Sequence, residues 1–64
     1  MKPVDDSLEI GKIYISVTGG PYPITAWAKL AEGRILSEIG IDEDDAIRRL
    51  KQNHPETINF MKSV

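Results

Sequence analysis

Hydrophobic and polar residues alternate cleanly along two short stretches of the chain. In residues 12–18 isoleucine and valine occupy every second position, and in residues 24–30 isoleucine, alanine and leucine do the same. A period of two is typical of β-strands that bury one face. We therefore predict strands at about residues 10–18 and 24–30, with the aliphatic side chains of both strands on one face of a sheet.

Glycine and proline residues separate the predicted strands. Gly19-Gly20-Pro21 predicts a turn, because glycine permits positive φ and proline fixes its own φ. Ala31-Glu32-Gly33 places glycine where a three-residue hairpin loop requires a left-handed residue. A third strand is predicted over residues 34–39, with Ile35 and Ile39 on the aliphatic face. Three short strands with tight connections predict an antiparallel meander.

A single amphipathic helix is predicted after the strands. Asp42 is a good N-cap, and the acidic residues that follow it suit the positive end of the helix dipole. Asp45 stands at the capping-box position, where Glu or Gln is more usual. The helix is expected to end by Asn53, because Pro55 disfavours the α conformation at the residue before it. An apolar stripe at helical spacing consists of Ile41, Ala46, Ile47 and Leu50.

The last residues of the chain allow two interpretations. Ile58 and Phe60 alternate as in a strand, whereas Pro55-Glu56 is typical of the first turn of a short helix, with Ile58 and Met61 on one side. The helix is slightly favoured. The predicted fold class is therefore α+β: a three-stranded antiparallel β-meander packed on one α-helix, with a short C-terminal helix or fourth strand.

The length and composition of the chain allow one small domain. Sixty-four residues bury only about 60% of their unfolded surface, and such a core rarely supplies more than ~3–5 kcal/mol. The chain has no cysteine, which suits a reducing cytoplasm. No apolar run approaches the ~18 residues of a membrane span, and the N-terminus lacks the order of a signal peptide. We expect a cytoplasmic protein, with a flexible acidic arm at residues 1–9 and one domain at residues 10–64.

Catalytic and metal-binding sites find little support in the sequence. His54, the only histidine, lies beside a proline at a helix end, with no nucleophile and acid placed to join it. The acids at residues 42–45 are explained by helix capping, because position 47 is Ile where a calcium loop needs Gly. Gly19-Gly20 precedes a strand rather than the Lys-Ser/Thr and helix of a phosphate-binding loop. We expect no enzyme activity, cofactor, metal or small-molecule ligand.

The polar face of the predicted sheet is the best candidate for a binding surface, because Tyr14 and the single tryptophan lie there among lysines and hydroxyls. Besides the candidate interaction residues, this face is predicted to include Ser16, Thr18 and Glu38. Its cations are two lysines and an arginine and its one anion is Glu38, which gives a local charge of +2 in a chain of net charge −2. The candidate interaction residues are Lys12, Tyr14, Thr25, Trp27, Lys29, Arg34 and Leu36.

Three interpretations of this face are open. In the first, the tail covers it, and Phe60 and Met61 form a second small core with the aromatic pair. In the second, the face binds a protein partner or a second copy in a homodimer, since Tyr, Trp and Arg are enriched in interface hot spots. In the third, Lys12, Lys29 and Arg34 neutralise the phosphates of a nucleic acid while the aromatic residues stack on bases. A pI near 5.2 argues against the third, and we predict a non-enzymatic protein-interaction module.

Residues 33–52, GRILSEIGIDEDDAIRRLKQ, resemble the third strand, acidic turn and helix of HicB-like antitoxin domains. In that family a strand ends in glycine, an acidic N-cap follows, and the helix opens with two acids and an alanine. The family's apolar-Pro-apolar-Gly-Cys segment has no counterpart before this turn. The resemblance implies an antitoxin-like regulator. The predicted β-β-β-α order of elements is also similar to that of the arm-type DNA-binding domains of some integrases, which lay a three-stranded sheet in the major groove. The residues that match the antitoxin pattern are Gly40, Asp42, Asp44, Asp45 and Ala46.

Overall fold

Four strands and one α-helix form a two-layer α+β fold in this computed structural model, which describes residues 8–63. The sheet has the order β3-β2-β1-β4; β1, β2 and β3 are antiparallel, and β4 runs parallel to β1. The predicted meander and helix are confirmed. Of the predicted acidic arm, only Leu8 and Glu9 belong to the described residues. The elements are β1 (Lys12–Val17), β2 (Ile24–Lys29), β3 (Ile35–Gly40), α1 (Glu43–Asn53), the 3-10 helix η1 (Pro55–Thr57) and β4 (Met61–Lys62).

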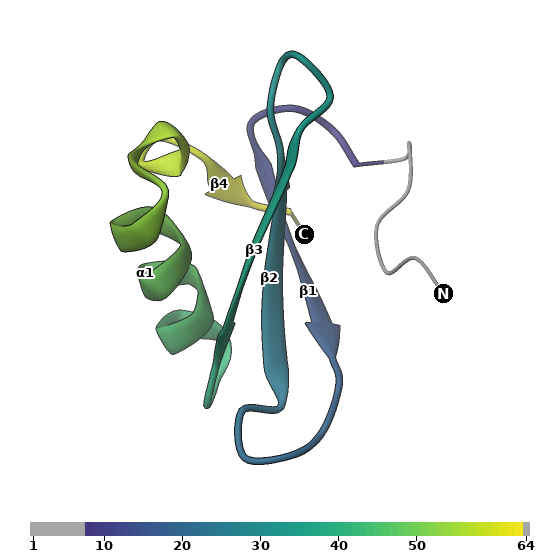
Figure 1. Cartoon of the computed structure of the whole chain (residues 1–64), viewed down its shortest axis with the longest axis vertical. Helices are drawn as coiled ribbons and strands as arrows, with labels where there is room; N and C mark the ends of the chain where they lie inside the picture. The colour runs from purple at the N-terminus through teal and green to yellow at the C-terminus, as the bar shows by residue number, and fades with distance from the viewer. Residues whose placement is uncertain (1–7, 64) are drawn as a thin grey trace.

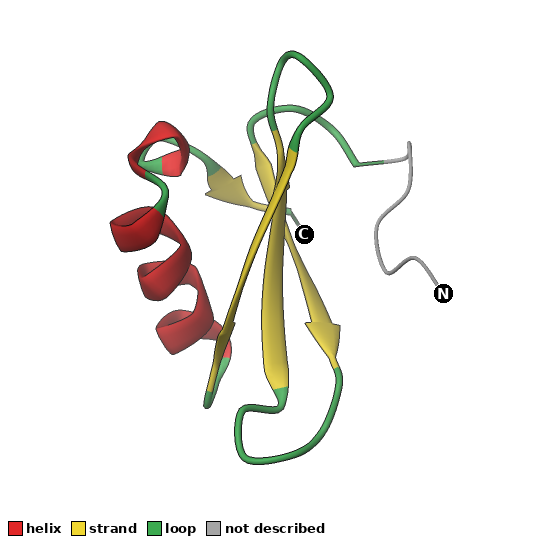
Figure 2. Ribbon diagram, viewed as in Figure 1, coloured by secondary structure: helices red, strands yellow, loops and turns green. Residues whose placement is uncertain are grey.

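The hydrophobic core lies between α1 and one face of the sheet, which we call the helix face (Figures 1 and 2). The register sets Ile13 opposite Ala28 and Ile15 opposite Ala26, so the aliphatic residues of β1 and β2 share this face as predicted. Burying a side chain the size of Ile or Leu contributes about 1.5–3 kcal/mol. The fully buried members of the core are Ile13, Ala26, Ala28, Ala46 and Leu50.

The faces of the third strand are the reverse of those predicted. Leu36 lies opposite Ala28, is only 8% exposed and joins the core. Ile35 and Ile39 lie on the opposite face of the sheet. Because side chains alternate along a strand, a one-residue change of register moves every side chain to the other face. Glu38 is thereby also moved to the helix face, where its carboxylate lies 3.8 Å from His54 Nε2.

The connection between β3 and α1 depends on a glycine and an N-cap. The Asp42 side chain accepts a hydrogen bond of 2.7 Å from the Asp45 backbone N–H, so α1 begins where the sequence predicts. At Gly40, an added Cβ would lie 2.7 Å from Ala46 Cα and 2.9 Å from the carbonyl carbon of Asp45. Only glycine leaves room for the helix to pack this closely on the end of β3. Ile41, predicted on the apolar stripe, is exposed.

The C-terminal residues combine both predicted forms, since the one-turn helix η1 is followed by the short strand β4. Thr57 is fully buried, and its hydroxyl donates a hydrogen bond of 2.8 Å to the His54 carbonyl. The Met61 backbone N–H donates to the Gly11 carbonyl at 3.1 Å, which joins the tail to the edge of β1. Phe60 packs against the core on the helix face.

Replacing Gly40 with alanine is expected to destabilise the fold by about 1–3 kcal/mol, because the new methyl group meets helix backbone rather than a movable side chain. Urea unfolding followed by circular dichroism measures the change. Ser37→Ala, at an exposed position of the same strand, serves as the control and should stay within about 0.5 kcal/mol of the wild type. Equal stability of Gly40→Ala and the control would contradict the close approach.

Candidate functional site on the outer sheet face

The sheet has a second face, turned away from α1, which we call the outer face. In Figure 1, α1 lies on one side of the three long strands, and the segment preceding β1 leaves on the other side. No helix in residues 8–63 lies against this face. Its strand residues are Lys12, Tyr14 and Ser16 on β1, Thr25, Trp27 and Lys29 on β2, Ile35, Ser37 and Ile39 on β3, and Met61 on β4, which pairs with Lys12.

An aromatic pair forms the centre of the outer face. Tyr14 and Trp27 are directly opposite each other on β1 and β2, and both are half-buried. Trp27 Nε1 donates a hydrogen bond of 3.0 Å to Ser16 Oγ, and the Tyr14 hydroxyl accepts one of 3.0 Å from the Glu9 backbone N–H. These bonds satisfy the polar atom of each ring and hold the rings on the sheet. What the pair offers to a ligand is therefore mainly apolar surface.

The apolar surface continues from the aromatic pair onto β3. Ile35 is 36% exposed and Ile39 is 47% exposed, on either side of Ser37, which lies opposite Trp27. Sequence reasoning missed these two residues and placed Leu36 here instead. A contiguous exposed apolar patch on a small domain is typical of a binding surface.

The three cations predicted for the site do not converge. Lys12 and Lys29 lie on the outer face, as predicted. Arg34 precedes β3, and its guanidinium lies 3.6 Å from carboxylates of both Glu32 and Glu56. Glu56 belongs to η1, which packs beside α1, so Arg34 is directed to the helix side of the sheet. The strand residues of the outer face consequently carry two cations and no anion.

The C-terminal tail does not cover the aromatic pair. Phe60 lies on the helix face, and Met61 lies beside Lys12 at the edge of the sheet, where it is 70% exposed. The prediction of a second core with Tyr14 and Trp27 is therefore wrong. The tail instead pairs with β1, whose outer backbone groups would otherwise lack hydrogen-bond partners within the sheet.

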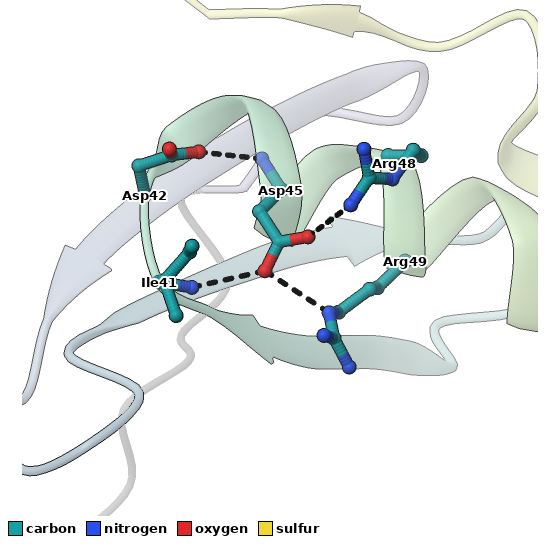
Figure 3. A network of polar contacts seen from close by, with 5 residues as sticks. All are labelled: Ile41, Asp42, Asp45, Arg48 and Arg49. Atoms are coloured by element: carbon teal, nitrogen blue, oxygen red, sulfur yellow. Dashed lines mark hydrogen bonds and ion pairs between the residues drawn. The ribbon is translucent and has the colours of Figure 1, made fainter.

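A buried carboxylate organises a separate polar cluster at the start of α1 (Figure 3). Asp45 accepts hydrogen bonds of 3.0 Å from the Ile41 backbone N–H and from Arg49 Nε, and one from Arg48. The hydrogen bond from the Ile41 backbone is the main reason that the pKa of Asp45 lies below its ordinary value. Burial of the carboxylate acts in the opposite direction and raises the pKa, whereas Arg49 and Arg48 lower it further. Asp45 thus secures the β3–α1 turn by accepting from the backbone N–H of Ile41. In a standard capping box, the side chain at this position accepts instead from the N–H of the N-cap residue, which here is Asp42. The oxygens of Asp45 are occupied within the fold, so the cluster is structural.

The polar side chains described include no cluster that could hold a metal ion. Within residues 8–63, no three His, Asp or Glu side chains gather where they could hold a metal ion, and no pocket is present. His54 contacts only Glu38 among acidic partners in this part of the chain. None of the helices described is long and apolar enough to cross a membrane. The outer face is the surface that needs a functional explanation.

Comparison of the chain with models of known protein families, with curated proteins and with solved structures finds no match. The resemblance of residues 33–52 to HicB-like antitoxin domains therefore stays a prediction. In the structure, this segment is strand β3, the acidic turn and most of helix α1.

The Asp45 cluster makes stability depend on pH. Because folding lowers the pKa of Asp45 from its ordinary value of 3.8, its stabilisation is fully present above that value and is lost as the pH falls through the lowered pKa. Asp45→Asn should therefore unfold at lower urea concentration at neutral pH and show a weaker dependence of the midpoint on acid pH. Asp44→Asn, an exposed carboxylate in the same turn, is the control. An unchanged acid dependence in Asp45→Asn would contradict the assignment.

Proposed function

We propose that this protein is a small non-enzymatic interaction module whose outer face binds a protein partner in the cytoplasm. The observation that carries the proposal is the continuity of the Tyr14/Trp27 pair with exposed Ile35 and Ile39 on a face that no described helix covers. Tryptophan and tyrosine are among the side chains enriched as hot spots in protein interfaces. The cytoplasmic setting is supported by the lack of cysteine.

The rigidity of the surface supports binding. All of its members stand on paired strands, and the Trp27 indole is held by its hydrogen bond to Ser16. A ring that is already fixed loses little conformational entropy when a partner packs on it. The free energy gained by burying the Trp27 ring against a partner would therefore be offset little by lost conformational entropy.

Charge indicates the chemistry of the partner. The strand residues of the face include Lys12 and Lys29 and no anion; Glu9 lies next to Tyr14, outside the strands. This arrangement complements a segment with apolar side chains flanked by carboxylates.

Nucleic acid is less well supported as a ligand. Arg34 lies on the other side of the sheet, and the residues that take its place, Ile35 and Ile39, neither neutralise phosphates nor stack as aromatic rings do. An antitoxin-like role would be a special case of the proposal, with a toxin as the protein partner.

The proposal is tested with synthetic peptides in which one apolar core is flanked by acidic, by basic or by serine residues. We expect the acid-flanked peptide to bind best and to shift the NMR amide signals of Tyr14, Trp27, Ile35 and Ile39. Trp27→Ala should weaken this binding by about 2 kcal/mol or more, roughly thirtyfold, because the central contact area is lost. Titrations followed by NMR measure the affinity.

Tyr22→Ala is the matched control for this experiment. Tyr22 is an exposed aromatic residue outside the strands, and Arg49 lies 5.7 Å from its ring centroid on the α1 side. Its removal should leave peptide affinity unchanged. Signals that shift only on the helix side, or a single-stranded oligonucleotide that binds more tightly than every peptide, would overturn the proposal.

A further inference from the structure

The two edges of the sheet are built differently. At one edge stands β4, which has two residues, one of them Lys62. At the other edge stands β3, which has six residues, ILSEIG, and no second partner strand within residues 8–63. Natural sheets protect their edges with short strands, lysine, proline, bulges or inward-pointing charges. β4 has two of these devices, whereas β3 has a continuous register and only the inward charge of Glu38.

The hydrogen-bond pattern shows which backbone groups β3 offers at its free edge. The Leu30 N–H donates to the Arg34 carbonyl at 2.7 Å, which begins the ladder between β2 and β3. Opposed residues in an antiparallel ladder alternate between bonded and non-bonded pairs, so Leu36 and Glu38 direct their backbone groups to β2. The residues whose amides and carbonyls face the free edge are Ile35, Ser37 and Ile39.

We propose that a second copy of this chain binds to this edge, with β3 antiparallel to β3 and a two-fold axis through Ser37. In this register Ile35 lies opposite Ile39 of the second copy, and the two outer faces join into one surface. The inference does not depend on the proposed function, because it concerns the edge of the sheet rather than the binding of a partner to the outer face.

The sequence of β3 fits its own copy. The two exposed isoleucines are placed symmetrically about Ser37, so they meet as apolar cross-strand pairs. Glu38 lies opposite Leu36 of the second copy rather than opposite a like charge, and Arg34 lies opposite Gly40, which has no side chain. Oligomerisation would also add stability to a domain of this size, whose single core supplies little.

The test is sedimentation analysis of the whole chain over a range of concentrations. We expect a dimer in the wild type. Ser37→Pro removes the central donor of the free edge but no bond to β2, because proline is tolerated where its missing N–H faces away from the ladder. It should raise the dimer dissociation constant by about tenfold or more while the circular dichroism spectrum is kept. Ser37→Ala, with the amide intact, should dimerise as the wild type does.

Cross-linking tests the register independently of how Ser37→Pro folds. The chain has no cysteine, so Ser37→Cys offers a single thiol, and a short bis-maleimide should link two copies through it. Asn59→Cys, exposed before β4, should not be linked. A wild type that stays monomeric, a dimer without linkage at Ser37→Cys, or a dimer that Trp27→Ala abolishes but Ser37→Pro does not, would each overturn the inference.

Discussion

The register of β3 against β2 is the constraint on which both faces of this sheet depend. It is set by the hairpin loop of residues 31–33, in which Gly33 has a positive φ of 86°. The residues that flank the loop form the first bond of the ladder, in which the Leu30 N–H donates to the Arg34 carbonyl. With that bond, Leu36 must face Ala28 in the core, and the isoleucines of β3 must lie on the outer face. A loop one residue longer or shorter would exchange the two sets of side chains.

The same register produces the two surfaces to which we assign binding. Side chains and backbone groups alternate together along a strand, so the residues of β3 whose side chains lie beside Trp27 are also those whose amides face the free edge. The apolar patch and the pairing edge are thus two properties of Ile35, Ser37 and Ile39. Pairing of two copies at the edge would double the patch, so a partner with two binding segments would gain affinity from both.

One helix can cover only one face of the sheet, and the chain uses its few remaining elements at the edges. Gly40 and the Asp45 cluster fix α1 closely over the helix face. The tail then pairs with β1 and sends Phe60 into the same core. On the outer face, the polar atoms of Tyr14 and Trp27 are satisfied locally, which allows the aromatic rings to stand there with no helix of residues 8–63 packed on them.

The sequence by itself determined the elements whose signals are local. Alternation placed the faces of β1 and β2, Gly33 placed the hairpin, and Asp42 placed the start of α1, because each depends on neighbouring residues. The tertiary structure decided the faces of β3, where apolar residues at 35, 36 and 39 do not alternate and only pairing with β2 selects between them. The three-residue loop fixes that pairing, since it sets Leu36 opposite Ala28. Only the fold showed that Arg34 turns to Glu56 and that the tail joins β1, because those partners are distant in sequence.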